Sequence, residues 1–556
     1  MKKIIALVCI VCLVMSLGLA ACGKTTASTA APSGSSGSSA APASSGSAST
    51  SEVTDVIGAG VAFHNTVKTD ETLVVALGQE PAHLISRMGA GMTAAYIRLM
   101  IGDGLVRYDY ETQEVKPGLL TEWEWVDETH IHAKVRQGVI ACDGTEFNAH
   151  DVIFSLEKGA ELAPNYMAKF FNVPNCVVED DYTIMFELSS PNYTVMNELT
   201  NAVCLFYDQS SYEAAGGDEG AAVNPLWGTG KYRFVEWVPG QYVLLERNEN
   251  YWDEEYVGYY KYIKFTFVPD SATRMMAVQS GDADVAMDVP LVQAAVLVGS
   301  GNCDVYNLVN NQNYGIEINC SEGSVMGSDI RLREAVRYAI DANALNQIIT
   351  AGYGNLEPFW LIKDSRFGSD PTNGAGVEYN PEKARELLKE AGYENGLELN
   401  TLCDTKNEEI LTALQAMLSE VGIKLNLVMA DQTVLFDMAK NGEFDINYNG
   451  HQALCFYRTN TFQCLNPRLI EAGAVNGGPR ILDPELQKLI DTVIETQDDD
   501  VTEKTCKAIE QYVYDNVAYV GIASGIYTVL AKPNMTGFAL PSDGGICDVA
   551  YVMPLN

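Results

Sequence analysis

The stretch ILTALQAMLSEVGIKLNLVMADQTVLFDMAKNGEFDINY (410–448) decides the fold class. Its apolar residues first recur at helical spacing up to Gly422, then alternate as in a strand, and both patterns then repeat. The predicted elements are a helix at 410–421, a strand at 423–427, a helix at 435–439 and a strand at 444–448. This alternation predicts an α/β architecture for residues 396–450.

Local signals elsewhere extend this interpretation. Polar capping residues open two of the predicted helices, and proline at a first helical position opens a third. The elements expected are a strand at 73–77, an antiparallel meander at 119–140, and helices at 148–158, 329–350 and 381–392. The helix at 329–350 has Asp329 as its cap and an apolar stripe that includes Leu332 and Val336.

The N-terminus carries an export signal. Lys2 and Lys3 precede the apolar run 4–19, which has the length of a signal peptide and is too short for a membrane span. Leu19-Ala-Ala-Cys22-Gly looks like a bacterial lipobox. We therefore expect a signal peptide at 1–21 and a lipid on Cys22, at the outer face of a Gram-positive type of cell membrane. The alternative is an ordinary secretory signal with a chance cysteine.

The segment after Cys22 predicts a tether. Residues 23–51 consist almost entirely of Ser, Ala, Gly, Thr and Pro, and such a segment cannot bury enough apolar surface to fold. We assign residues 22–65 to the lipidated cysteine and its tether. The remaining body, from about residue 66 to 556, is too long for one core, so two or three lobes are expected.

The charge balance limits the partners. With 36 Lys and Arg against 73 Asp and Glu, the formal net charge is −37, which opposes binding to nucleic acid or anionic lipid. Acidity of this kind usually serves solubility, and a preference for cationic ligands is the alternative. We expect a monomer.

Metal, disulfide and catalytic patterns give no site. Ten cysteines follow Cys22 without any CxxC spacing, and we expect mostly reduced, buried thiols, although disulfides stay open. His130 and His132 share one face of a strand, and His451, Cys455 and Cys464 could meet, but neither set has a common zinc spacing. No nucleophile, acid–base or phosphate-loop motif occurs. We predict no catalytic residue, no metal and no cofactor.

Several blocks together resemble a known family. The two most specific are NENYWDEEYVGYYKYIKFTFVPDSATRMMAVQSGDADVAM (248–287) and DIRLREAVRYAIDANALNQIITAGYG (329–354). The further blocks are 73–84, 116–158, 379–393 and 418–427. They are similar to the extracytoplasmic solute-binding proteins of ABC transporters, in the oligopeptide, dipeptide and nickel-binding family (family 5).

This resemblance implies an α/β, two-lobed trap of the periplasmic-binding-protein type, class II, with an extra inserted α+β subdomain. The implied parts are lobe one at 66–105, 200–310 and 518–556, the insert at 106–199, and lobe two at 311–517. The lobes would close around a solute, and the closed form would deliver it to the permease subunits of an ABC transporter. Such a protein is not an enzyme.

The resemblance also implies where the solute contacts the chain. The positions are Ser86, Arg87 and Met88 after the first strand, Tyr314 at the lobe crossing, Trp360 on a loop, and Asn449 and His451 after the strand 444–448. Arg87 is either a solvated charge or an anchor for a ligand carboxylate. Tyr314, Trp360 and His451 either line the cleft or pack in the core.

Two other classes remain open from the sequence. A lipid-anchored hydrolase would need a convergent acid, base or nucleophile, and a pheromone or peptide signalling receptor would use the same trap. The ligand also stays open between peptides, modified peptides, opine-like compounds, oligosaccharides and metal chelates. The stretch 449–455 has no acid where peptide-binding members place an aspartate that pairs with the peptide ammonium group. We therefore expect a solute without that requirement, unless Asp431 or Asp445 supplies the charge.

Overall fold

A computed structural model provides the structure of the protein. It describes residues 68–85, 91–109, 114–163, 167–201, 204–297, 300–362, 367–368, 378–404, 406–452, 461–475, 477–538 and 547–555. The predicted signal peptide, Cys22 and the tether lie outside the described residues. Among those described, no helix has the length and apolarity needed to cross a membrane.

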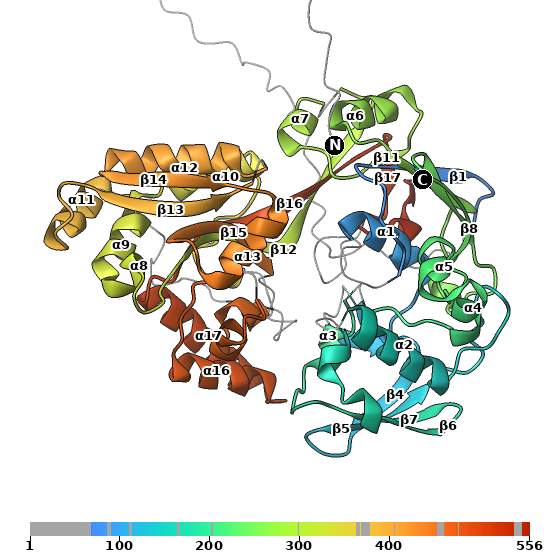
Figure 1. The fold of residues 1–556 in the computed structure, drawn as a ribbon. Coiled ribbons are helices and arrows are strands. Elements are labelled where there is room, and N and C mark those ends of the chain that lie inside the picture. Colours follow the sequence, from blue (N-terminus) through green and yellow to red (C-terminus); the bar gives the residue numbers. More distant parts are fainter. Residues whose placement is uncertain are drawn as a thin grey trace, which may run out of the picture. The chain divides into compact units, whose positions relative to one another are not determined.

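An eight-stranded sheet runs through the body of the protein (Figure 1). β1 pairs in parallel with β10 and β11, whereas β8, β9, β12, β15 and β16 pair antiparallel with their neighbours. In sheet order, the strands are β15 (Ile446–Gln452), β12 (Asp304–Ile318), β16 (Tyr519–Ala531), β11 (Val285–Ala286), β1 (Thr72–Leu77), β10 (Tyr262–Phe267), β9 (Tyr242–Arg247) and β8 (Tyr232–Val238).

One group of helices packs with the β1 side of this sheet. Its core is the largest apolar cluster, which combines β1, α1 and β10 with the end of the chain, and a smaller cluster forms around α6 and α7. The elements are α1 (Gly91–Ile101), α4 (Gln209–Ala214), α5 (Gly217–Val223), α6 (Ser271–Ser280), α7 (Leu291–Ala295), the short 3-10 helices η3 (Glu254–Tyr256) and η5 (Val549–Tyr551), and the hairpin β17 (Met535–Thr536) and β18 (Met553–Pro554). We name this group the first lobe.

A separate four-stranded antiparallel sheet carries its own core, which includes Phe147, Phe186 and Leu156. Its order is β4 (Leu120–Trp125), β5 (His130–Val135), β7 (Thr183–Glu187) and β6 (Val177–Asp180). Beside it lie the hairpin β2 (Val106–Asp109) and β3 (Glu114–Pro117), the helices α2 (Ala149–Leu162) and α3 (Val195–Glu198), and the 3-10 helices η1 (Met167–Phe170) and η2 (Val173–Asn175). This α+β unit, named the insert, occupies the part of the chain where a subdomain is expected.

The second lobe has cores of its own, drawn from residues 316–523. The parallel pair β13 (Leu397–Cys403) and β14 (Ile423–Met429) is connected through α12; the sequence predicts this helix and the strand at 423–427, and β13 is an additional strand. The helices are α8 (Val325–Ser328), α9 (Ile330–Ala339), α10 (Ala342–Thr350), α11 (Pro381–Glu390), α12 (Glu408–Glu420), α13 (Gln432–Asn441), α15 (Pro467–Glu471), α16 (Pro484–Ile494), α17 (Asp499–Asp515) and the 3-10 helix η4 (Gln463–Leu465).

The helix predicted at 329–350 is two helices. α9 begins after Asp329, whose carboxylate accepts a hydrogen bond from the N–H of Arg331 (2.9 Å), as expected. The chain then leaves helical geometry at Ile340, and Asp341 caps α10 by accepting from Ala344 (3.1 Å). The apolar stripe continues across this break, so periodicity alone did not reveal it, although a mid-segment aspartate is a recognised helix start.

Two long antiparallel strands connect the lobes. β12 and β16 run side by side (Figure 1), and their register shifts between Val309 and Asn313 and again after Tyr314. Before the shift β12 contributes Val305 and Tyr306 to the first-lobe clusters, and after it Ile316 belongs to the second-lobe core. We propose lobe boundaries close to residues 310 and 525. The second comes later than residue 518, because Val520, Ile522 and Ala523 pack in the second-lobe core.

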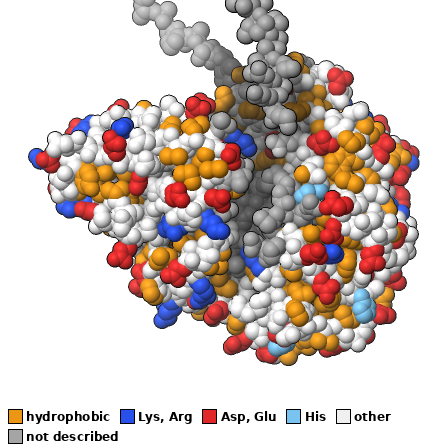
Figure 2. All heavy atoms as spheres, viewed as in Figure 1, with side chains coloured by type: hydrophobic (Ala, Val, Ile, Leu, Met, Phe, Trp, Pro, Cys, Tyr) orange, Lys and Arg blue, Asp and Glu red, His pale blue; other side chains and the backbone are white. Residues whose placement is uncertain are grey.

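Charged side chains and cysteines are distributed over the described residues as follows. On the face shown in Figure 2, Asp and Glu side chains are spread over the surface with Lys and Arg among them. The nine cysteines within the described residues are free thiols, five of them buried. Cys455 lies outside the described residues.

Candidate ligand-binding site

The strand crossing brings several predicted residues together. β12 pairs with β16 on one side and with β15 on the other, so that Asn313 lies opposite both Ser524 and His451. Tyr314 follows on β12, and Asn449 lies on β15 opposite Gly315. Three distant segments of sequence therefore converge where the chain passes between lobes.

Trp360 and His451 form a buried stack. Their rings lie 3.6 Å apart at an interplanar angle of 17°, and Tyr519 meets both edge-on. The imidazole Nε2 contacts the Trp360 carbonyl oxygen at 2.8 Å, and burial lowers the pKa of His451 to about 4. The sequence left these two residues open between cleft lining and core packing, and the structure packs Trp360, fully buried, into the second-lobe core.

A buried carboxyl group holds the backbone at Trp360. The two oxygens of Glu510, on α17, accept the backbone N–H groups of Trp360 and Leu361 at 3.1 Å each. Burial raises the pKa of Glu510 to about 8, against the lowering effect of these two hydrogen bonds. The indole Nε1 donates to the carbonyl of Thr461 at 2.9 Å. These contacts join residues separated by more than 90 positions, so local sequence could not predict them.

Two polar atoms in this region have no described partner. Asn313 donates from Nδ2 to the Phe359 carbonyl, yet its Oδ1 has no hydrogen bond among the described residues. The Nδ1 atom of the neighbouring His451 likewise has no hydrogen bond among the described residues. Buried polar atoms without partners are rare in native proteins, and a bound polar ligand or water is a common reason for them. They mark this crossing as a place where a solute could add hydrogen bonds.

Asn449 and Tyr314 each make a side-chain contact beside the strand crossing. Asn449 donates from Nδ2 to Glu317 Oε1 at 3.1 Å, and Gly478 N–H reaches the other oxygen at 3.0 Å. Burial raises the pKa of Glu317 despite these donors. Tyr314 is partly exposed and stacks on Tyr448, with ring centroids 6.0 Å apart. Of the four second-lobe candidates, Tyr314 and Asn449 keep accessible surface and could therefore touch a solute.

The remaining predicted contacts, Ser86, Arg87 and Met88, lie outside the described residues. The chain that leads to them is anchored, because Arg98 on α1 donates from Nη1 to the Ile85 carbonyl at 3.1 Å. His83 Nδ1 also lies 3.2 Å from the same carbonyl. Leu84 and Ile85 are fully buried in the first-lobe core.

Sequence reasoning missed an acidic group at the same end of the first lobe. Asp288 follows β11, whose carboxyl end lies beside that of β1, and strand ends of this kind are where α/β proteins bind ligands. Tyr96 donates to its Oδ1 at 3.2 Å, and Tyr527 on β16 contacts the Tyr96 hydroxyl. Its backbone has φ of 52°, which is uncommon outside glycine.

Asp288 is exposed to solvent, yet neighbouring protein atoms partly desolvate its carboxyl group. This desolvation raises the pKa of Asp288, against the effect of Tyr527, Tyr96 and Arg274. Unlike Asp288, the pair Asp282 and Asp284 gives no site: Asp284 accepts from Val74 N–H at 2.7 Å and pairs with Lys532.

The two other acids considered for a ligand ammonium group are engaged locally. Asp445 accepts both the backbone N–H (2.8 Å) and the side-chain amide (3.1 Å) of Asn400. Asp431 accepts from Val434 N–H at 3.2 Å, at the start of α13.

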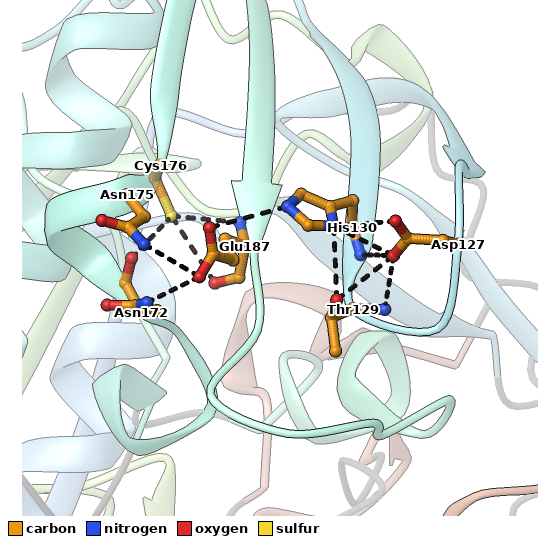
Figure 3. Close-up of polar contacts among 7 residues, drawn as sticks. All are labelled: Asp127, Thr129, His130, Asn172, Asn175, Cys176 and Glu187. Carbon is orange, nitrogen blue, oxygen red and sulfur yellow. Dashed lines mark hydrogen bonds and ion pairs between the residues drawn. The ribbon is translucent and has the colours of Figure 1, made fainter.

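The two strand histidines are partly exposed on the insert, and Figure 3 shows the contacts of His130. His130 lies between Asp127, whose Oδ1 is 2.9 Å from Nδ1, and Glu187, which is 3.5 Å from Nε2. Glu187 in turn accepts from Asn172 at 2.6 Å and from Asn175 at 2.9 Å. His132 pairs separately with Glu179. Within the described residues, no group of three or more His, Cys, Asp or Glu side chains is placed to hold a metal ion.

This arrangement gives a pH prediction. The hydrogen bond to Asp127, reinforced by Glu187, raises the pKa of His130 above 6.5, while Thr129 N–H and His130 lower the pKa of Asp127 to about 2. The pair's stabilisation is then complete between the unfolded pKa values of aspartate and histidine. It is lost as pH rises through the raised histidine value, and also as pH falls through the lowered aspartate value. NMR titration of ¹³C-labelled histidines should show this raised pKa, and Asp127→Asn should lower it. An unchanged titration in that variant would contradict the contact.

Comparison with known proteins identifies the family. Residues 114–462 match the model of the bacterial extracellular solute-binding proteins, family 5 (middle region), which is well over half of the chain. The chain belongs to this family. Family 5 consists of transporter solute-binding proteins and not of enzymes, in agreement with the lack of a catalytic constellation in the sequence.

Among individual relatives, this family 5 chain is 29% identical over 310 residues to the glutathione-binding protein GsiB of Salmonella typhi. The match covers 53% of this chain and 57% of GsiB, so the chain spans little more than half the length of that relative.

Solved structures share the fold. The periplasmic binding protein DppA of Helicobacter pylori, in complex with the peptide STSA, has a TM-score of 0.73 at 20% identity over 87% of this chain and 98% of its own. NikA of Brucella suis, in complex with Fe(III)-EDTA, has a TM-score of 0.75 at 18% identity over 87% of this chain and 100% of its own. The two-lobed α/β fold that the sequence predicts is therefore confirmed.

Proposed function

We propose that the protein captures a small peptide or peptide-like solute between its two lobes and delivers it to the permease of an ABC importer. Family membership supports solute binding, and the names of GsiB and DppA point to peptides as the chemical class. We also propose that it is a monomer, anchored outside the cell by a lipid on Cys22 through the tether that ends near residue 65.

One observation carries the capture mechanism: β12 and β16 connect two lobes that have separate cores. Their register shifts at the crossing, so the ladder is interrupted where bending would occur. A solute that contacts both lobes would favour the closed form in proportion to its extra contacts there.

The proposed contacts come from both lobes. The first lobe would supply Ser86, Arg87 and Met88 together with Asp288 and its partner Tyr96, and the second Tyr314 and Asn449. Trp360 and His451 would act behind them: their contact would hold the end of β15, and Asn313 Oδ1 and His451 Nδ1, which have no partner among the described residues, would accept hydrogen bonds from the solute.

We expect binding that does not require a free amino terminus. No described acid of the second lobe beside β15 is free for an ammonium group, since Asp445 and Glu317 already accept several donors. Isothermal calorimetry with a library of di- to hexapeptides should therefore give similar affinities before and after amino-terminal acetylation. If neither library binds, the peptide proposal is wrong, and native mass spectrometry of gently purified protein would identify the solute class instead.

A variant of Asp288 tests which lobe would bind a peptide ammonium group. If free-amine peptides bind tightly and acetylation abolishes binding, an ammonium pocket exists, and Asp288→Asn tests whether the first lobe supplies it. Asp282→Asn, on an exposed position of the same segment, is the matched control.

The anchor has its own test. Cys22→Ser removes the only side chain that a lipoprotein signal of this type can modify, so the protein should move from the membrane fraction into the medium. Immunoblots of fractionated cells measure this change. Retention of the variant in the membrane fraction would contradict the anchor.

A further inference from the structure

A pocket is lined by residues of the insert and of the first lobe. None of its lining residues belongs to the crossing strands β12 and β16. Its volume is about 370 Å³, within the range of small-molecule sites. Arg107, Asp109, Lys116, Pro117 and Arg136 line it from the insert, and Trp252, Asp253 and Tyr256 line it from the first lobe.

The aromatic wall of this pocket is held rigidly. Asp103 accepts the indole N–H of Trp252 at 3.1 Å and the hydroxyl of Tyr251 at 2.8 Å. The same carboxylate accepts from the Thr229 hydroxyl at 2.9 Å. The plane of Trp252 is therefore fixed before any ligand arrives, which reduces the entropy cost of binding.

Two guanidinium groups lie against that wall. The Arg107 group lies 4.2 Å from the centroid of the Tyr256 ring and 5.5 Å from that of Trp252, and it pairs with Asp253 at 2.6 Å. The Arg136 group lies 4.2 Å from the Trp252 centroid and donates from Nε to the Gly118 carbonyl at 2.9 Å.

Arg136 has unused donors. Among the described residues, no carboxylate pairs with it and no acceptor meets its two terminal nitrogens. Burial and the neighbouring charge of Arg107 lower the pKa of Arg136, against the raising effect of Asp253 and Asp103. Of the three cationic side chains that line the pocket, Arg107 pairs with Asp253 and Lys116 pairs with Glu114, whereas Arg136 has no carboxylate partner among the described residues.

We propose that this pocket binds a small oxyanion, a carboxylate or phosphate group, through the terminal nitrogens of Arg136. A planar guanidinium fork matches both groups in a bidentate manner. The bound anion would relieve the repulsion between the two arginines and would tie the insert to the first lobe. This site is separate from the proposed solute site and does not depend on the identity of the solute.

The test is calorimetry at low ionic strength with acetate, citrate and inorganic phosphate, each titrated into the full-length protein. Saturable binding of at least one anion is expected, and Arg136→Gln should weaken it by about tenfold or more, the effect of losing a charged bidentate contact. The relative affinities of citrate and phosphate tell the carboxylate from the phosphate source. Lys134→Gln is the matched control, because it removes one positive charge from the same strand segment on an exposed side chain paired with Glu122.

Equal binding by the wild type and Arg136→Gln, or an equal loss in Lys134→Gln, would overturn the proposal. So would the absence of saturable binding by all three anions. If Arg136→Gln does not fold, Arg136→Lys keeps the charge without the fork, and it should still weaken the anion contact several-fold.

Discussion

Replacing Glu510 by alanine should lower the free energy of unfolding by about 3–5 kcal/mol. The variant leaves the N–H groups of Trp360 and Leu361 without their acceptor in a buried region, and each unsatisfied group costs ~1–3 kcal/mol, to which the lost side-chain volume adds. Chemical denaturation followed by circular dichroism measures the change. Glu503→Ala, at an exposed position of the same helix, should change stability by less than ~0.5 kcal/mol.

A loss in Glu510→Ala no larger than in Glu503→Ala would show that the Glu510 carboxyl group does not hold the Trp360 loop.

Glu510 also gives a prediction about the pH dependence of stability. Because burial raises its folded pKa to about 8 from 4.5, the folded state retains a proton that the unfolded state releases. Stability should fall by roughly 4–5 kcal/mol from this group as pH rises between those values. Glu510→Gln, which cannot ionise, should lack that part of the pH dependence.

Asp548→Asn should have an effect of similar size, about 3–5 kcal/mol, in the first lobe. Asp548 lies 2.7 Å from the Lys231 ammonium group, and both side chains are only 11% exposed. Burial alone would lower the pKa of Lys231, but the attraction of Asp548 and Tyr551 outweighs it and raises the pKa. The single variant leaves this ammonium group buried without its counter-charge, and denaturation curves would reveal the loss.

The double variant Lys231→Met with Asp548→Asn gives the control. Asparagine can still accept from Ala550 N–H, the contact by which Asp548 caps η5, and methionine fills the space without a charge. We expect the double variant to recover at least ~2 kcal/mol relative to Asp548→Asn. If the double variant is no more stable than Asp548→Asn, the loss in the single variant does not come from the unpaired charge of Lys231.

Much of the second lobe could be predicted from local sequence. Asn380 and Pro381 open α11 as expected, with the asparagine accepting from Lys383 N–H at 3.0 Å, and the apolar stripe near 410–421 is α12. These elements form where capping, periodicity and breakers agree. The sequence stretches that resemble family 5 also predict the order of the lobes along the chain, since these stretches extend over parts of both lobes.

The site was harder to predict for physical reasons. Glu510, on a helix 150 residues later, holds the Trp360 backbone, and Trp360 stacks on His451, 91 positions away; no local pattern encodes such contacts. Asp288 is one of 73 acids, and only its place after β11 beside Tyr96 and Tyr527 distinguishes it. Likewise, the Trp227-Gly-Thr-Gly-Lys231 turn offers no phosphate loop, yet it carries the buried lysine that pairs with Asp548.

The pairing of Asn313 with Ser524 has a consequence for how such a protein could be assembled from parts. The second lobe starts and finishes on neighbouring strands, and the clusters that fill it draw on residues between those two positions. A segment whose two ends meet can be cut out, or exchanged for that of a relative, without breaking the chain around it. Recombination at these two strand positions is thus a direct route to chimeric proteins that combine the second lobe of one family member with the first lobe of another.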